Sequence, residues 1–142
     1  MKGLAGLLFG IVAAAAAMML VGFVGDFFSP TNVSTDPASP GGVARLIQTA
    51  STGAQLFILL AWFAGALAGA AAAKSVAWVS WPGWTIAGLL ALLLAASFLA
   101  PLPVWMQIGA VLGPLAGGLI ADLIVRGRDA RRAPRRADDG AL

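Results

Sequence analysis

Long runs of apolar residues, separated by short polar segments, dominate the chain. Four runs are long enough to be membrane-spanning helices, and they cover residues 4–25, 55–73, 84–100 and 104–125. An α-helix rises about 1.5 Å per residue, so about 20 residues cross a hydrocarbon core of about 30 Å. The pattern therefore predicts an all-α membrane protein whose domain, residues 1–125, is a bundle of four transmembrane helices.

The polar breaks between these runs have the composition of turns. Residues 26–42 contain Pro, Gly, Asn, Ser, Thr and Asp without an apolar period, which predicts a loop. From Val43 an amphipathic pattern resumes and predicts an interfacial lead-in to the second span. Ser80 and Pro82 are typical of a helix start. The segment Pro101-Leu102-Pro103 is too short and too rich in proline for anything but a tight helical hairpin.

The composition agrees with this membrane assignment and narrows the chemistry. Hydrophobic residues make up 60% of the 142 residues, charged residues 11%, and the mean hydropathy is +0.90. Soluble domains are about 45–50% apolar and about 25% charged. The chain has no His, Cys, Tyr or Glu, which excludes His and Cys metal sites, thiol chemistry and His-ligated haem. We expect no metal, no cofactor and no enzymatic activity, because no pair of catalytic groups lies at a shared depth.

The few charges predict an orientation for the bundle. With four spans, Lys2, Lys74 and the Arg126–Arg136 cluster fall on one side, and only Arg45 falls on the other. Lys and Arg in short loops remain in the cytoplasm, so both termini are expected there and loop 26–42 outside. Trp78, Trp81 and Trp84 mark a membrane surface between the second and third spans. An alternative for the first run is a signal peptide cleaved after Ala15-Ala16-Ala17.

Small residues recur at a spacing of four on several spans. Gly6 and Gly10 form one such pair, Ala61, Gly65, Gly69 and Ala73 a second stripe, and Gly109, Gly113, Gly117 and Ala121 a glycine zipper. Such stripes allow helix backbones to approach closely. They predict either packing inside the bundle or a face for self-association or partner binding. Pro114 lies within the zipper and predicts a kink, because it frees the carbonyl of Ala110.

Polar residues within or near the spans are the candidate site residues. Asp122 lies about 27 Å along the fourth span, where an ion pair with Arg126 at i+4 is available. Asp26 ends the first span, and Arg45 is its possible partner. Near the same boundary, Gln55 and Gln107 belong to a Gln/Thr cluster that forms either interhelical hydrogen bonds or a polar vestibule, whose other members are Gln48, Thr52 and Ser97. Trp62 lies deep in the second span and needs an acceptor, a ligand or a partner subunit.

The C-terminal segment, residues 126–142, predicts a basic cytoplasmic tail that is disordered beyond about Asp129. It holds six Arg and three Asp residues. Arginines beside a span bind anionic lipid and also act as the signal that fixes topology. Nucleic-acid binding is not expected, because no soluble module accompanies the charge.

The segment from Leu59 to Gly69, LLAWFAGALAG, together with the Pro- and Asp-containing loop and the Pro-x-Pro hairpin before Trp105, resembles a group of small uncharacterised four-helix bacterial membrane proteins. In that group an acidic residue and a His often end the first helix, and only Asp26 corresponds to them here. The resemblance implies topology and no activity.

Taken together, these patterns predict a multi-pass protein of the bacterial inner membrane. The function expected first is that of a structural or accessory protein that acts by helix–helix association, as a homo-oligomer or within a larger membrane complex. The alternative is a small oligomeric transporter or channel whose polar elements are Asp122, Pro114 and the outer Gln/Thr cluster.

Overall fold

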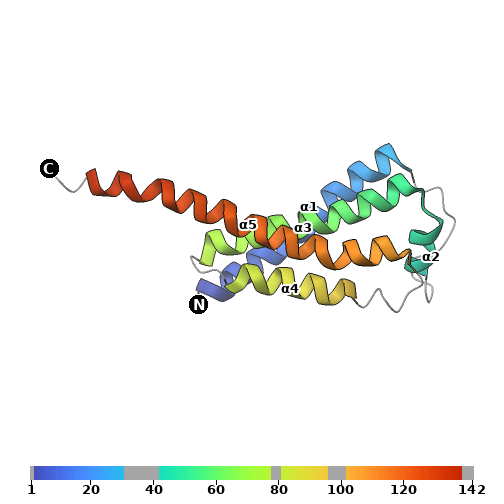
Figure 1. Ribbon diagram of the computed structural model, residues 1–142, viewed down its shortest axis with the longest axis horizontal. Coiled ribbons are helices and arrows are strands. Elements are labelled where there is room, and N and C mark those ends of the chain that lie inside the picture. Colours follow the sequence, from blue (N-terminus) through green and yellow to red (C-terminus); the bar gives the residue numbers. More distant parts are fainter. Residues whose placement is uncertain (1, 31–41, 78–80, 96–101, 139–142) are drawn as a thin grey trace.

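The computed structural model describes residues 2–30, 42–77, 81–95 and 102–138, with only the backbone for 43, 44 and 129–138. These residues form helices and contain no strand. The helices are α1 (Lys2–Phe28), α2 (Gly42–Thr49), α3 (Thr52–Ala77), α4 (Trp81–Ala95) and α5 (Val104–Asp138). Helices α1 and α3 run together and cross α5 at an angle, and α5 projects beyond the others (Figure 1).

Three of the helices are long and apolar enough to cross a membrane. They are Lys2–Phe28, Thr52–Ala77 and the Val104–Arg128 part of α5, whereas the described part of α4, Trp81–Ala95, is shorter. The all-helical class predicted from the sequence is therefore found, together with three candidate spans and a fourth, shorter apolar helix. Residues 96–100 of the third predicted span lie outside the described residues.

Helix α3 is the centre of the bundle, because α1, α4 and α5 all pack against it. The neighbours of the glycines give the directions of the helices. Gly6 lies beside Ala73 and Gly25 beside Phe57, so α1 and α3 are antiparallel. Gly109 lies beside Leu59 and Gly117 beside Leu67, so α3 and α5 are parallel. We call the two ends of the bundle the Asp26 end and the Lys74 end.

Close backbone approach explains why glycine occupies several of these positions. A Cβ atom on Gly10 would lie 2.7 Å from the carbonyl oxygen of Gly69, and one on Gly69 would lie 2.9 Å from that of Gly10. A Cβ on Gly117 would lie 2.9 Å from the carbonyl oxygen of Phe63. These glycines therefore face neighbouring helices of the same chain, where they permit van der Waals contact between backbones.

The helix boundaries differ from the predicted ones where polar residues interrupt the apolar runs. α1 continues past Asp26 to Phe28, because Phe27 and Phe28 follow the acid and Pro30 is the first residue that cannot continue a helix. The lead-in to the second span is a separate helix, α2. The hydroxyl of Ser51 accepts a hydrogen bond from the amide of Ala54 at 3.2 Å and so caps a new helix.

The expected disorder beyond Asp129 is wrong for residues 130–138, the part of the tail that the structure describes. The described backbone of α5 is helical from Val104 to Asp138, through Pro134, instead of ending near Val125. Arg and Ala, which are strong helix formers, supply most of this extension. Figure 1 shows it leaving the bundle at the end where the N-terminus also lies.

Candidate functional site

Two sites on the described residues combine polar or charged groups with the apolar bundle, and they lie at opposite ends of α3. The first is a cluster of ions at the Lys74 end. The second is a groove between α1 and α3 at the Asp26 end. Trp62 lines the groove and Lys74 lies 12 residues further along α3, which corresponds to about 18 Å of helix.

The ion cluster joins α3 to α5. The Lys74 ammonium donates to the Asp122 Oδ1 atom at 2.6 Å, and the Arg126 guanidinium lies 2.9 Å from Asp122 Oδ2. The Lys74 side chain is 3% exposed and that of Asp122 is 13% exposed, whereas the Arg126 side chain is 74% exposed. Asp122 is therefore shared between a buried cation and an exposed one.

Helix α4 completes the surroundings of the buried cation. The Lys74 ammonium lies 5.4 Å from the ring centroid of Trp84, within range of a cation–π interaction. A Cβ atom on Gly83 would lie 2.9 Å from Cγ of Lys74, so this glycine leaves room for the lysine stem. The sequence predicts a pair of Asp122 with Arg126 only, and it places Lys74 at a membrane boundary. The contact between Lys74 and Asp122 was not predicted, because these residues are 48 positions apart.

The groove at the Asp26 end has a volume of about 330 Å³ and is predominantly apolar. The α1 residues that line it are Met18, Gly22, Gly25 and Asp26, and the α3 residues are Ala54, Phe57, Ile58, Ala61 and Trp62. Trp62, singled out in the sequence for its depth, thus lies in the wall of a groove. Asp26 is the only ionisable residue in this lining.

Aromatic contacts hold the two walls of the groove together near the Asp26 end. The rings of Phe28 on α1 and Phe57 on α3 are stacked, with centroids 6.3 Å apart and an interplanar angle of 6°. Gly25 makes room for this contact, because a Cβ there would lie 2.8 Å from the Cβ of Phe57. Gly22, one turn earlier on α1, has nothing within 4 Å of its would-be Cβ. The groove is therefore open above Gly22.

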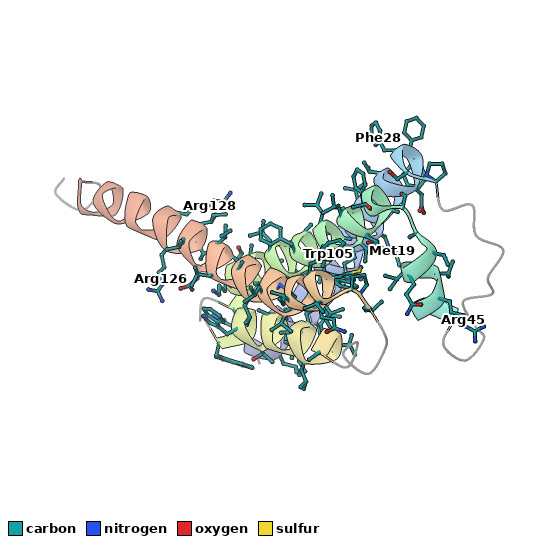
Figure 2. All side chains as sticks on the ribbon, turned by 45° about the vertical axis from the view of Figure 1, so that its right-hand side comes forward. Met19, Phe28, Arg45, Trp105, Arg126 and Arg128 are labelled. Carbon is teal, nitrogen blue, oxygen red and sulfur yellow. The ribbon has the colours of Figure 1, made fainter. Side chains whose placement is uncertain are left out.

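The outer amides serve as local helix contacts in the structure. The side chain of Gln55 donates to the carbonyl oxygen of Ile47 at 2.9 Å, which fastens α2 to the start of α3. The side chain of Gln107 donates to the carbonyl oxygen of Leu102 at 3.1 Å. The predicted pair between Asp26 and Arg45 is not among the ion pairs of the described residues. Figure 2 shows Arg45 on α2 pointing away from the bundle.

The glycines predicted for helix association differ in how closely a neighbouring helix packs against them. Gly65 contacts Met18 of α1, Gly69 contacts Ala14 of α1, and Gly109 and Gly117 face α3. Gly113 is looser, because its nearest neighbour is the Cβ of Phe63 at 3.9 Å. Pro114, between these glycines, is fully buried. Within the described residues, no group of three Asp, Glu, His or Cys side chains is placed to hold a metal ion.

Comparison with known proteins finds no match: no family model, no curated protein and no solved structure is similar to this chain. The fold and the two sites described above are therefore the basis for any inference about function.

Proposed function

We propose that this chain is a small multi-pass protein of the bacterial inner membrane, of structural or accessory type, which acts by binding another transmembrane helix. The observation that carries this proposal is the groove between α1 and α3, which is open above Gly22 and has the small side chains of Ala54 and Ala61 in its lining. Small residues let a third helix approach closely, and close packing is the main source of helix affinity in lipid.

Most other glycines of the bundle are already in contact with neighbouring helices. Gly6, Gly10, Gly65, Gly69 and Gly117 all have atoms of another helix within 3.4 Å of a would-be Cβ. Gly22 has none within 4 Å. Association through the fourth-span zipper would require the bundle to open, whereas association at Gly22 would not.

The proposed orientation keeps both termini in the cytoplasm. The contact of Gly3 with Trp81 and that of Lys74 with Asp122 bring Lys2, Lys74 and Arg126 to the same end of the bundle. This clustering supports an Arg- and Lys-rich cytoplasmic side. Retention of the first span is part of the proposal, because Gly6, Gly10 and Ala14 pack against α3.

The basic end of α5 is proposed to contact anionic lipid. Arg126 and Arg128 are exposed and extend from the helix surface where α5 leaves the bundle (Figure 2). Arginines near an anionic surface contribute about 1 kcal/mol each. In nanodiscs of mixed lipids, the protein should therefore bind phosphatidylglycerol in preference to phosphatidylcholine. The double variant Arg126→Gln/Arg128→Gln should weaken this preference.

Association at the groove is tested with single-cysteine variants, because the native chain has no cysteine. Gly22→Cys places a benzophenone maleimide at the open side of the groove, because nothing lies within 4 Å of a Cβ atom at this position. Leu20→Cys, two residues away on the same helix, places the label on a side chain that is 66% exposed and outside the groove. In native membranes we expect a discrete protein adduct at position 22 and none at position 20.

A third variant ties the adduct to the shape of the groove. Ala61→Leu in the Gly22→Cys background fills the floor of the groove and should abolish the adduct while the variant still unfolds cooperatively in detergent. Equal labelling at positions 20 and 22, or an adduct that survives Ala61→Leu, would contradict association at this surface.

A further inference from the structure

Asp26 is a carboxylate without a counter-ion in the part of the chain that the structure describes. The two ion pairs found there, Lys74–Asp122 and Arg126–Asp122, both involve the other acid. Asp26 belongs to the groove lining and is solvent-accessible at its rim. A carboxylate at the rim of an apolar groove attracts a cation carried by a helix in that groove, as the members of an exposed ion pair attract each other.

The groove has the linear shape of a helix-binding seam. Met18, Gly22 and Gly25 follow one another at i, i+4 and i+7 on α1. Ala54, Ile58 and Ala61 repeat the same spacing on the antiparallel α3. Residues at these spacings share one helix face, so the two stripes run side by side for about 10 Å. A third helix laid along them would insert its side chains between the stripes.

We propose that the groove binds a transmembrane helix of another protein that carries a Lys or Arg at the level of Asp26. This inference rests on the proposed association and adds the chemistry of the partner. The aliphatic stem of such a residue would lie along the apolar groove while its charge meets the carboxylate. Phe57 and Trp62 line the same groove and supply apolar surface for this stem.

The charges of this chain favour a different protein over a second copy. In a second copy of the same orientation, the basic residues of the long helices are Lys2, Lys74 and the arginines of α5 from Arg126 onward, and all of them lie at the opposite end from Asp26. Only Arg45, on the short helix α2, lies at the Asp26 end. A membrane-spanning helix that presents a cation beside Asp26 must therefore come from another chain.

The test uses designed helices in place of the natural partner. Three single-span peptides of about 20 residues are built from Ala, with Leu at positions i, i+4 and i+7 of one face. They differ only at one position near the end that lies level with Asp26, which is Lys, Gln or Asp. Each is reconstituted in vesicles with the full chain bearing benzophenone at Gly22→Cys, and the photo-adduct yield is measured. Asp36→Asn, which removes another acid of the chain, is the control for net charge.

We expect the Lys peptide to give about three times the adduct of the Gln peptide, since an exposed ion pair changes an affinity by up to about five-fold. Asp26→Asn should give equal adduct yields for the Lys and Gln peptides, and Asp26→Lys should give the highest yield with the Asp peptide. Asp36→Asn should leave all yields unchanged. Equal yields from Lys and Gln peptides with native Asp26, or a Lys preference that persists in Asp26→Asn, would overturn the inference.

Three outcomes separate this inference from the proposed association and from a small ligand. If no peptide reacts more at position 22 than at position 20, the association itself fails. If all peptides react equally at position 22, association stands and the ionic recognition is wrong. The last outcome concerns hexyltrimethylammonium and its uncharged tert-butyl analogue. If only the cation protects the cysteine at position 22 from labelling, if this protection requires Asp26, and if the Lys peptide does not react, the groove binds a cationic amphiphile and the inference is overturned.

Discussion

Removing the carboxylate of Asp122 should destabilise the bundle more than removing the ammonium of Lys74. In Asp122→Asn the Lys74 ammonium, which is 3% exposed, loses the negative charge that it contacts at 2.6 Å and keeps only a neutral amide oxygen as an acceptor. Trp84 at 5.4 Å remains its nearest source of stabilisation. An unpaired buried charge costs about 3–5 kcal/mol, so we expect a loss of that order in the free energy of unfolding.

The reverse substitution leaves a less severe defect. In Lys74→Met the Asp122 carboxylate keeps its contact with Arg126 at 2.9 Å and is itself 13% exposed. The lost hydrogen bond between charged groups is worth about 1.5–3 kcal/mol. Arg126→Gln, which removes the partner that is 74% exposed, should cost less than about 1 kcal/mol.

The double variant Lys74→Met/Asp122→Leu tests whether the cost arises from unpaired charge. Replacing both ions by apolar groups of similar size is commonly neutral, so we expect stability within about 1 kcal/mol of the native chain. The assay is SDS titration of the protein in mixed micelles, followed by circular dichroism. The reasoning would be refuted if Lys74→Met lost more unfolding free energy than Asp122→Asn. It would also be refuted if the double variant were as unstable as the less stable single variant.

Three further predictions concern packing, the short helix and topology. Gly69→Val should lower the SDS midpoint strongly, because its Cβ would lie 2.8 Å from that of Ala14, whereas Gly22→Val, with nothing within 4 Å, should leave it unchanged. Gln55→Ala should release α2 by removing the 2.9 Å bond to Ile47, at a cost of about 1 kcal/mol. Faster hydrogen exchange over residues 42–49, with α3 unaffected, is the expected signature. Ser29→Cys should react with an impermeant thiol reagent in spheroplasts and Ser75→Cys only after lysis; the opposite labelling would invert the proposed orientation.

The apolar runs were sufficient to predict the helical class, because runs of this length have few structural alternatives. Their ends were less predictable. An acid such as Asp26 signals a boundary in the sequence, yet two phenylalanines after it carry α1 on to Phe28. A run of Arg and Ala signals a solvated tail, yet the same residues propagate α5 to Asp138. Helix propensity accounts for the extension of α5, whereas at the end of α1 the ring of Phe28 packs on Phe57 of α3.

The pairing of Lys74 with Asp122 was hidden from local patterns, since the i+4 neighbour Arg126 offered a simpler partner. A signal for it did exist. Both residues stand near the ends of two predicted spans on the same side of the membrane, and an acid and a base at one depth attract each other. The choice between neighbouring helices depends on which spans are adjacent, and the structure places α5 beside α3 through close contacts at Gly109 and Gly117.

The two ends of the molecule differ in how far their charges are compensated, and this difference locates the expected function. At the Lys74 end, Asp122 contacts two cations, and an aromatic ring and a glycine surround the buried one. This cluster joins α3 to α5. At the Asp26 end, a carboxylate without a partner among the described residues borders an open seam of small and aromatic residues. Because no described residue pairs with that charge, the Asp26 end is the surface at which we propose that the partner helix binds.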